Sequence, residues 1–326
     1  MKLRLCVIGC GGFARIFAES LADARDKVDL YFASRDLGRA KVYSDEFDGL
    51  GAFGSYEEAA ASPDVDALYV CTPHDLHLEH TVLATAGNKH VLLEKPIART
   101  INEAMSIISV AREAGVSLMV AENYRFLSPV LEAKKLIDSG IVGQVRLIQL
   151  QEEFPFAPSS WRNDRERTGG GVLIDGGIHK ASVLTYLSGR PNRVYAVQVP
   201  SVNPGINAED GIIVTTCSPE GVVGIINHTW SLSRPTERPW VSVTGTLANL
   251  HFEMGRPWLK IGYKDTQETR TFDDDHRGII GMVLEFRRSI LEGTEPAMTG
   301  EEGLKDLALV LKAYESAESG LPETLE

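Results

Sequence analysis

The sequence is short of cysteine, of long apolar runs and of positive charge. Its four cysteines, Cys6, Cys10, Cys71 and Cys217, are spread over 326 residues without a Cys-x-x-Cys pair. A disulfide frame or a zinc site is therefore not expected, and the thiols are predicted to be reduced and mostly buried. No run of about 18 apolar residues is present to span a membrane. The opening MKLRLCVIGC also lacks the longer apolar core and cleavage site of a secretory signal. We therefore expect a cytoplasmic protein.

Acidic side chains outnumber basic ones. The 33 Lys and Arg residues face 45 Asp and Glu residues, which gives a formal net charge of -12. Non-specific nucleic-acid binding needs a basic face, and this balance argues against one. We expect a small-molecule partner, with neither nucleic acid nor a membrane as a binding partner.

The first part of the chain alternates short apolar runs with helical patterns. Residues 1–122 are predicted to form an α/β domain on a parallel, doubly wound sheet, because strand and helix units succeed one another along it. The expected strands are 3–9, 28–34, 65–72, 89–95 and 116–122, and the expected helices are 13–24, 37–47, 76–86 and 101–115.

The residue pattern changes after Asn123. Residues 123–326 are predicted to form a second α/β domain on a large, open, mostly antiparallel sheet, because β-branched runs there are separated by turn signals. The expected strands are 145–154, 193–199, 211–217, 222–230 and 241–246. One face of the sheet is expected to pack helices 179–189 and 278–293, and the other to meet a second subunit. We expect a homo-oligomer, a dimer or a tetramer. The last helix, about 301–319, is a candidate to pack back toward the first domain.

A glycine-rich turn follows the first expected strand. GCGGFA fits the dinucleotide-binding pattern G-x-G-x-x-G/A, and it lies between a strand and a helix, where that pattern needs to be. Gly9 permits the tight turn, Gly11 lets the backbone approach a pyrophosphate, and Ala14 keeps the helix close to the strand. The predicted cofactor contacts of this Rossmann turn are Gly9, Gly11, Gly12, Phe13 and Ala14.

The end of the second strand bears on the choice of cofactor. An acidic residue there would bind the ribose 2′-hydroxyl of NAD, whereas an arginine accommodates the 2′-phosphate of NADP. Ser34 stands where the acid is expected, and Arg35 follows it. NADP is favoured and NAD stays possible, because Asp36 is close by; alternatively, Asp36 is the N-cap of the next helix.

Two further segments should line the cofactor crevice, because ligands of open α/β sheets bind beyond the carboxyl ends of the strands. CTPHDLHLEH supplies Thr72, Pro73 and His77, and EKP supplies Glu94 and Lys95. His74, His77 and His80 also raise the alternative of a metal site, but no second cluster offers the remaining ligands, so no metal is predicted.

These motifs together resemble the Gfo/Idh/MocA oxidoreductase family. The segments that carry the resemblance cover most of the chain in order: GCGGFA, CTPHDLHLEH, EKP, AENYRF, WRNDRERTGGGVLIDGGIH and SAESG. The resemblance implies a nucleotide domain, a second domain on an open sheet, and hydride transfer between NAD(P) and a sugar, cyclitol or similar hydroxyl compound. It also implies that Lys95, Asp175 and His179 act at the substrate carbinol. Members often carry Asp or Asn three residues after the histidine, where this chain has Ser182, which leaves the substrate class open.

The glycine-rich stretch 169–179 contains two titratable groups. If a helix begins near Gly177, Asp175 lies at its start and His179 one turn further on, so both side chains are able to face one cleft. The glycines are expected to let the backbone pass close to substrate or nicotinamide. His179 is predicted to be the general acid/base, Lys95 to stabilise alkoxide charge, and Asp175 to orient substrate or lysine. The alternatives are an N-cap for Asp175 and a buried structural histidine.

Three further residues are candidates for the substrate pocket. Arg125, Trp161 and Arg162 offer guanidinium forks and an aromatic face, which suit hydroxylated or anionic ligands. Each is equally compatible with interdomain packing. Two other functions remain alternatives on this scaffold: a redox-neutral, nicotinamide-assisted hydrolase or lyase, and a non-catalytic dinucleotide-binding sensor.

Overall fold

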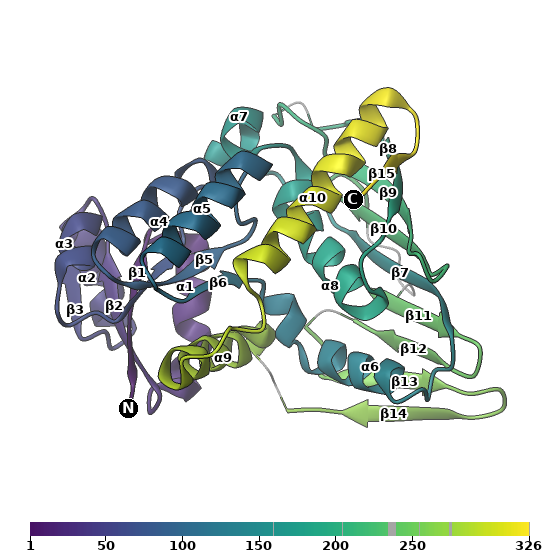
Figure 1. The fold of residues 1–326 in the computed structure, drawn as a ribbon, viewed down its shortest axis with the longest axis horizontal. Coiled ribbons are helices and arrows are strands. Elements are labelled where there is room, and N and C mark those ends of the chain that lie inside the picture. Colours follow the sequence, from purple (N-terminus) through teal and green to yellow (C-terminus); the bar gives the residue numbers. More distant parts are fainter. Residues whose placement is uncertain (159, 204, 234–238, 254, 274–275, 326) are drawn as a thin grey trace. The chain divides into compact units, whose positions relative to one another are not determined.

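The chain is divided into two compact units (Figure 1). The computed structural model describes residues 1–158, 160–203, 205–233, 239–253, 255–273 and 276–325. The first unit comprises Met1–Asn123 and Ile279–Leu304, and the second comprises Tyr124–Gly278 and Lys305–Glu326. The second unit is therefore not the continuous stretch 123–326 that the sequence suggested.

The first unit is built on a parallel sheet with the strand order β3-β2-β1-β4-β5-β6. This is the order of a dinucleotide-binding fold, which reverses direction between its first and fourth strands. The apolar runs of the central strands are buried on both faces, as parallel sheets require. The strands are β1 Leu3–Ile8, β2 Val28–Ala33, β3 Gly51–Phe53, β4 Ala67–Val70, β5 His90–Glu94 and β6 Leu118–Ala121.

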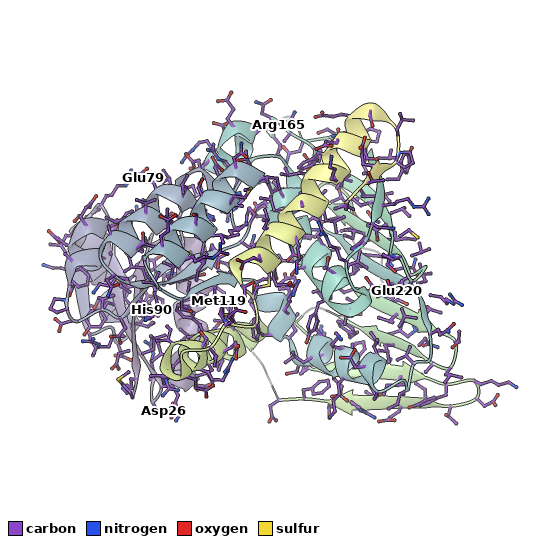
Figure 2. All side chains as sticks on the ribbon, in the orientation of Figure 1. Asp26, Glu79, His90, Met119, Arg165 and Glu220 are labelled. Atoms are coloured by element: carbon purple, nitrogen blue, oxygen red, sulfur yellow. The ribbon has the colours of Figure 1, made fainter. Side chains whose placement is uncertain are left out.

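Helices connect these strands, and several begin at side-chain caps. Asp36, Ser55 and Thr100 each accept a hydrogen bond from a main-chain N–H of the helix that follows, as good N-caps do. The helical segments are α1 Gly12–Ser20, η1 Ala22–Ala24, α2 Leu37–Glu46, α3 Tyr56–Ala61, η2 His74–Leu76, α4 His77–Ala86, α5 Ile101–Glu113 and α9 Ile279–Glu292. Figure 2 shows the contrast within this unit between the buried Met119 of β6 and the exposed Glu79 of α4.

The second unit is built on a larger sheet with the order β14-β13-β12-β11-β7-β10-β9-β8-β15. Its β10–β7 pair is parallel and its other described pairs are antiparallel. The strands are β7 Val145–Glu153, β8 Arg193–Gln198, β9 Gly211–Cys217, β10 Val223–Thr229, β11 Val241–Gly245, β12 Asn249–Phe252, β13 Trp258–Gly262, β14 Gln267–Thr271 and β15 Glu323–Thr324.

One face of this sheet packs against helices. α8 contacts β7 and β10, and α6 contacts α8 and β13. The opposite face exposes apolar side chains, because burial alternates along the strands: Tyr195, Val197 and Ile213 are 40%, 51% and 43% exposed. The helical segments are η3 Asn123–Phe126, α6 Ser128–Asp138, η4 Ser160–Asn163, α7 Arg165–Thr168, η5 Leu173–Gly177, α8 Ile178–Ser188, η6 His276–Gly278 and α10 Gly300–Ser319. The first turn of α10, up to Leu304, belongs to the first unit. Gly320 follows α10 with a φ of 70°, which suits a C-terminal glycine.

The structure confirms the predicted fold class and corrects the placement of one helix. We expected α9 to pack on the sheet of the second unit. It packs with α1 in the first unit instead. The sequence reading also missed β3, α3 and the strands β12–β14. No helix within the described residues has both the length and the apolarity needed to cross a membrane.

Candidate functional site

The turn after β1 has the backbone geometry of a phosphate-binding loop. Gly9 has a φ of 97°, and a Cβ there would lie 2.5 Å from the carbonyl oxygen of Cys71, so glycine is required. A Cβ at Gly11 or Gly12 would meet no atom within 4 Å, which leaves room above the loop. Gly11 is the N-cap of α1 and provides no side-chain acceptor. The first amides of α1 are thus suited to an anion such as a diphosphate.

The end of β2 and the first turn of α2 carry two arginines and an acid that is already engaged. Asp36 accepts hydrogen bonds from the main-chain N–H groups of Gly38 and Arg39 at 2.9 and 3.3 Å, so its carboxylate caps α2. Arg35 and Arg39 are both exposed. Burial raises the pKa of Tyr56, and both guanidinium charges act on that phenol in the opposite direction. Arg39 is a cationic candidate that the sequence analysis missed.

His77 ties together the two loops that follow β4 and β5. Its side chain is fully buried, with Nδ1 2.9 Å from the carbonyl oxygen of Pro96 and Nε2 3.1 Å from that of Thr72. Burial lowers the pKa of His77 to about 4. The Lys95–Pro96 peptide bond is cis. The ring thus contacts main chain on both sides and links the loop after β4 to the loop that carries Lys95. Cofactor binding by His77 stays a prediction.

Glu94 faces the interior of the first unit. It is 7% exposed, and the hydroxyl of the fully buried Tyr69 donates a hydrogen bond to its carboxylate. Burial raises the pKa of Glu94 to about 7, against the opposing charge of Lys95. Glu94, a predicted cofactor residue, is therefore a buried neighbour of Lys95. Its raised pKa means that the Glu94 carboxyl group changes protonation near neutral pH.

Three predicted residues of the second unit lie together. Asp175 is within the π-helical turn η5, and Arg162 Nε donates to its Oδ2 at 2.9 Å. The Arg162 guanidinium lies 4.6 Å from the ring centre of Trp161, a cation–π distance. The helical conformation begins upstream of Asp175, at Leu173 and not near Gly177. Asp175 therefore lies inside the first turn, and the alternative reading of this residue as an N-cap is wrong. Single π-helical turns of this kind are frequent at functional sites.

The ring of His179 is held against an aromatic platform. It stacks on Tyr124 with ring centres 3.9 Å apart, and Tyr124 meets Trp240 edge-on at 5.3 Å. Beside them, the fully buried Lys180 donates to Glu152 and lies 5.6 Å from the Tyr124 ring. Stacking fixes the plane of the imidazole while leaving it 8% exposed. Sequence reading included Tyr124 only as part of a motif, because a stacking partner so distant along the chain leaves no local signal.

A buried pair, Tyr314 and Glu209, holds the start of the helix that carries Asp175 and His179. The Tyr314 hydroxyl accepts the N–H groups of Gly171 and Ile174 at 3.1 Å each and donates to Glu209 Oε1 at 2.6 Å. Glu209 Oε1 also accepts the N–H of Leu173 at 2.9 Å. The main-chain oxygen of Glu209 accepts a fourth N–H, from the residue between Gly171 and Leu173. The pair thus satisfies four helix-start amides that have no partner within the helix.

This pair supplies a packing reason for the glycine-rich stretch. A Cβ at Gly170 would lie 2.5 Å from the Tyr314 hydroxyl, and one at Gly171 would collide with Glu209. A Cβ at Gly176 would collide with the ring of His228. At these positions the structure shows a close approach to side-chain and main-chain atoms of the same unit. An approach to a ligand stays a prediction.

Arg125 and Ser182 are paired in the interior of the second unit. Arg125 is 7% exposed; its Nε donates to the Ser182 hydroxyl at 2.7 Å, and its Nη2 lies 3.3 Å from Asp306 Oδ1. This chain therefore uses Ser182 to hold an arginine between α8 and α10. Binding of substrate by Arg125 stays a prediction.

Two family models match the chain. One, described as an oxidoreductase family with an NAD-binding Rossmann fold, matches residues 3–122. The other, the GFO/IDH/MocA C-terminal domain, matches residues 130–251. The chain belongs to the Gfo/Idh/MocA oxidoreductase family. This confirms the resemblance seen in the sequence.

Relatives of this Gfo/Idh/MocA chain are similar over most of their length. The 1,5-anhydro-D-fructose reductase of Ensifer adhaerens is 28% identical over 326 residues, which cover 98% of each chain. The trans-1,2-dihydrobenzene-1,2-diol dehydrogenase of Danio rerio is 31% identical over 252 residues, 76% of this chain and 74% of that one. The crystal structure of aldose-aldose oxidoreductase from Caulobacter crescentus complexed with glycerol covers 100% of both chains, with a TM-score of 0.90 and 26% identity. The chain is thus an NAD(P)-dependent oxidoreductase, as predicted.

The structure brings the predicted residues of this Gfo/Idh/MocA chain together within each unit. In the first unit, Thr72, His77, Glu94 and Lys95 belong to adjoining loops linked by His77. In the second, Asp175 pairs with Arg162 beside Trp161, while Arg125 pairs with Asp306 in a separate group. His179 belongs to neither pair and stacks on Tyr124. The described residues contain no group of three or more His, Cys, Asp or Glu side chains arranged to hold a metal ion.

Proposed function

We propose that this chain transfers a hydride between NADP and a hydroxyl or carbonyl carbon of a sugar, cyclitol or related small molecule. The observation that carries the proposal is the segment η5–α8, which presents Asp175 paired with Arg162 and, one turn later, His179 stacked on Tyr124. A carboxylate and an oriented imidazole on one helix are the groups that removal of a hydroxyl proton requires. The two relatives are named as a reductase of an anhydro sugar and a dehydrogenase of a diol, which supports the same class of substrate.

Each residue has a distinct role in this proposal. Bound nicotinamide supplies the hydride acceptor, held through the Gly9–Ala14 turn with Thr72 and Pro73 nearby. His179 accepts the hydroxyl proton as the carbinol is oxidised and returns it in the reverse direction. Lys95 stabilises negative charge on the reacting oxygen. Asp175 orients the substrate hydroxyl.

The Asp175–Arg162 pair refines the role of the carboxylate. Its Oδ2 accepts the Arg162 Nε–H, and the Asp175 side chain is 7% exposed, so the guanidinium fixes its direction. With its charge balanced, the carboxylate serves as a hydrogen-bond acceptor for a substrate hydroxyl rather than as a proton acceptor. Trp161, against which Arg162 lies, supplies an apolar face of the kind that packs on sugar rings.

The end of β2 and the start of α2 support the proposed preference for NADP. The carboxylate that would bind a ribose 2′-hydroxyl is engaged in capping α2, while Arg35 and Arg39 offer two exposed guanidinium groups. A 2′-phosphate forms charge-assisted, bidentate hydrogen bonds with such groups. The Ser34 hydroxyl, which accepts the Asp36 N–H at 3.2 Å, holds this strand end in shape.

We also propose that the open face of the second unit's sheet joins two copies of the chain. Val197 and Ile213 are opposite each other in the β8–β9 register and are half exposed, with Tyr195 two residues away on the same face. A charge at Ile213 would have to be desolvated in such an interface. The Ile213→Lys variant should therefore shift the mass measured by light scattering toward the monomer. An unchanged mass would contradict this interface.

The experiment that tests the proposed reaction is a panel of sugars, inositols and diols, assayed by the absorbance of reduced nicotinamide with NADP and NAD separately. We expect turnover with sugar-like compounds and NADP. Lys95→Ala and His179→Ala should each lower turnover by roughly 10²–10⁴-fold, the usual contribution of a general acid/base, with coenzyme affinity nearly unchanged. Lys27→Ala is the matched control, since that exposed lysine pairs only with its neighbour Asp26 in the described contacts. Turnover equal to that of wild type in both Lys95→Ala and His179→Ala would contradict the proposed mechanism.

A further inference from the structure

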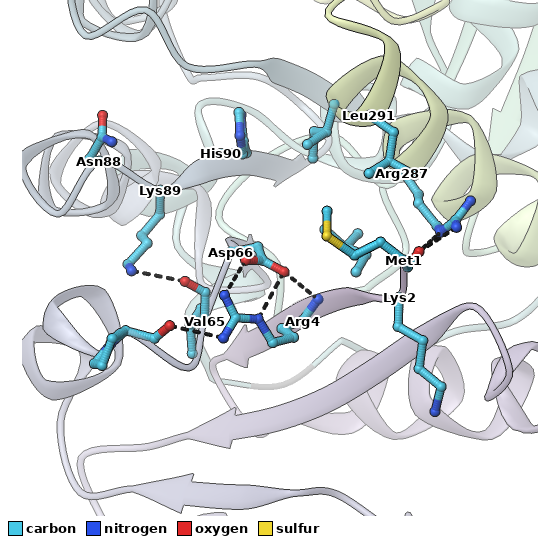
Figure 3. A pocket seen from close by; sticks show the side chains of 13 residues that line it. Met1, Lys2, Arg4, Val65, Asp66, Asn88, Lys89, His90, Arg287 and Leu291 are labelled. Carbon is cyan, nitrogen blue, oxygen red and sulfur yellow. Dashed lines mark hydrogen bonds and ion pairs between the residues drawn. The ribbon is translucent and has the colours of Figure 1, made fainter.

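Two lysine side chains are buried among the described residues, and their surroundings differ. Lys89 of the first unit is 9% exposed, and its Nζ donates to the main-chain oxygens of Ser62 and Val65 at 2.6 and 2.8 Å. Figure 3 shows this ammonium group turned toward the main chain, so it ties together the loop between α3 and β4. Lys180 of the second unit is fully buried and contacts a carboxylate, a carbonyl group and two aromatic rings.

The Lys180 ammonium group bridges the end of β7 and the π-helical turn η5. Its Nζ donates to the Glu152 carboxylate of β7 and, at 3.2 Å, to the main-chain oxygen of Gly176. Gly176 is also packed against the ring of His228, with which a Cβ at this position would collide. The Nδ1 atom of His228 lies 3.2 Å from the main-chain oxygen of Glu152 and 3.6 Å from its Oε2. Lys180 and His228 therefore both hold Gly176, the residue that follows Asp175.

The same ammonium group lies beside the aromatic platform of His179. Its Nζ is 5.6 Å from the ring centre of Tyr124 and 5.9 Å from that of Trp240, and both distances are within cation–π range. Tyr124 in turn stacks on His179 with an angle of 15° between the ring planes. One buried cation thus contacts both the ring on which His179 rests and the turn that carries Asp175.

A buried ion pair such as Lys180 and Glu152 is a poor source of stability. Both charges lose their hydration when the chain folds, and replacing such a pair by uncharged side chains of similar volume is often neutral or stabilising. The two side chains are 1% and 12% exposed, so they lose nearly all of their contact with water. What the pair supplies is direction, because the ammonium group fixes the positions of Tyr124 and Gly176 relative to β7.

We propose that Lys180 is a positioning residue for the reaction proposed above. It orients the His179 ring by holding Tyr124. It also fixes the turn that presents Asp175, by holding Gly176. Its fully buried ammonium group acts through these residues and not on the substrate. The importance of the His179 orientation rests on the proposed reaction, but that orientation is measurable without turnover.

Nuclear magnetic resonance of the full chain, labelled at histidine, measures the orientation of His179. Stacking on Tyr124 displaces the ring-proton resonances of His179 upfield, and these signals are assigned by their loss in His179→Ala. The test variant is Lys180→Met/Glu152→Gln, because Lys180→Met alone would leave a buried carboxylate without its partner. We expect it to lose most of the upfield displacement that Tyr124→Leu abolishes. Turnover should fall about tenfold or more, as misplacement of a reacting group does, with the KM for the coenzyme unchanged.

Two further variants complete the test. Glu152→Gln alone keeps the volume of the side chain and weakens the hold on the ammonium group, so a smaller loss of the upfield displacement is expected. Lys134→Met/Asp138→Asn is the matched control, since Lys134 pairs with Asp138 on α6 and lies 5.8 Å from the ring centre of Tyr186. This control removes the same kinds of group away from the His179 platform, and its His179 resonances and turnover should equal those of wild type.

The outcomes separate this inference from the proposed reaction. A wild-type upfield displacement in folded Lys180→Met/Glu152→Gln, or in both this variant and Glu152→Gln, would overturn the positioning role. Wild-type turnover of an active sugar by the folded test variant would overturn it as well. If no compound of the panel is turned over by wild type and the His179 resonances still respond as expected, the proposed reaction is wrong and the positioning of His179 by Lys180 is supported.

Discussion

Tyr314→Phe should damage the helix start that carries Asp175 more than any surface tyrosine substitution would. The variant keeps the ring and removes the hydroxyl, which leaves the N–H groups of Gly171 and Ile174 buried without their acceptor. Each such group costs about 1–3 kcal/mol, so we expect the free energy of unfolding to fall by about 2–4 kcal/mol after local relaxation. The donor to Glu209 Oε1 is lost as well, but that oxygen keeps the N–H of Leu173.

Urea unfolding of wild type and variant measures this loss, through the change in midpoint at constant slope. Tyr263→Phe is the matched control: Tyr263 follows β13 and is 37% exposed, and its loss of a hydroxyl should change stability by less than about 0.5 kcal/mol. Because the same turn positions Asp175, Tyr314→Phe should also lower turnover while leaving the KM for the coenzyme unchanged. Stability within about 0.5 kcal/mol of wild type would refute the role assigned to the hydroxyl.

Three further predictions concern cofactor choice, pH and the glycine turn. Arg35→Ala should weaken NADP binding by about tenfold or more while sparing NAD, as loss of a charge-assisted contact does; equal weakening of both in fluorescence titrations would contradict it. Burial raises the pKa of Glu94 to about 7 from 4.5, so the folded chain binds this proton more tightly than the unfolded chain and stability declines as pH rises through that window. The unfolding free energy of wild type minus that of Glu94→Gln should therefore decrease as the pH is raised from about 4.5 to 7. A difference that stays constant over this range would oppose this. Gly171→Ala should destabilise the chain by about 1–3 kcal/mol, because the added methyl group overpacks against Glu209. A urea-unfolding midpoint equal to that of wild type would contradict this prediction.

The parts of the fold that the sequence revealed are those with long, unambiguous patterns. The central strands β1, β4 and β5 are continuous apolar runs because both faces of a parallel sheet are buried. β3 is only Gly51–Phe53 and is partly exposed, so it carries no such pattern. α9 has a helical pattern that sequence identified correctly, but nothing local indicates which unit will bury its apolar face.

The same distinction applies to the candidate site. GCGGFA was recognisable because its glycines act through local backbone geometry, as the φ of Gly9 shows. Tyr314 and Glu209 were missed because their partners lie more than a hundred and about forty positions away along the chain. For the same reason the glycines were expected to face a ligand, whereas Gly170 and Gly171 adjoin that pair. Hydrogen bonds between segments far apart along the chain produce no local sequence pattern from which they could be predicted.

The measurement that tests the central claim most directly is the fate of the hydrogen on the oxidised carbon. A sugar active in the panel, deuterated at that carbon, is incubated with the chain and NADP, and the coenzyme is analysed by mass spectrometry. The account predicts that reduced nicotinamide accumulates with the deuterium on its ring, and that His179→Ala abolishes most of this transfer. Product formed without deuterium reaching the nicotinamide would contradict it.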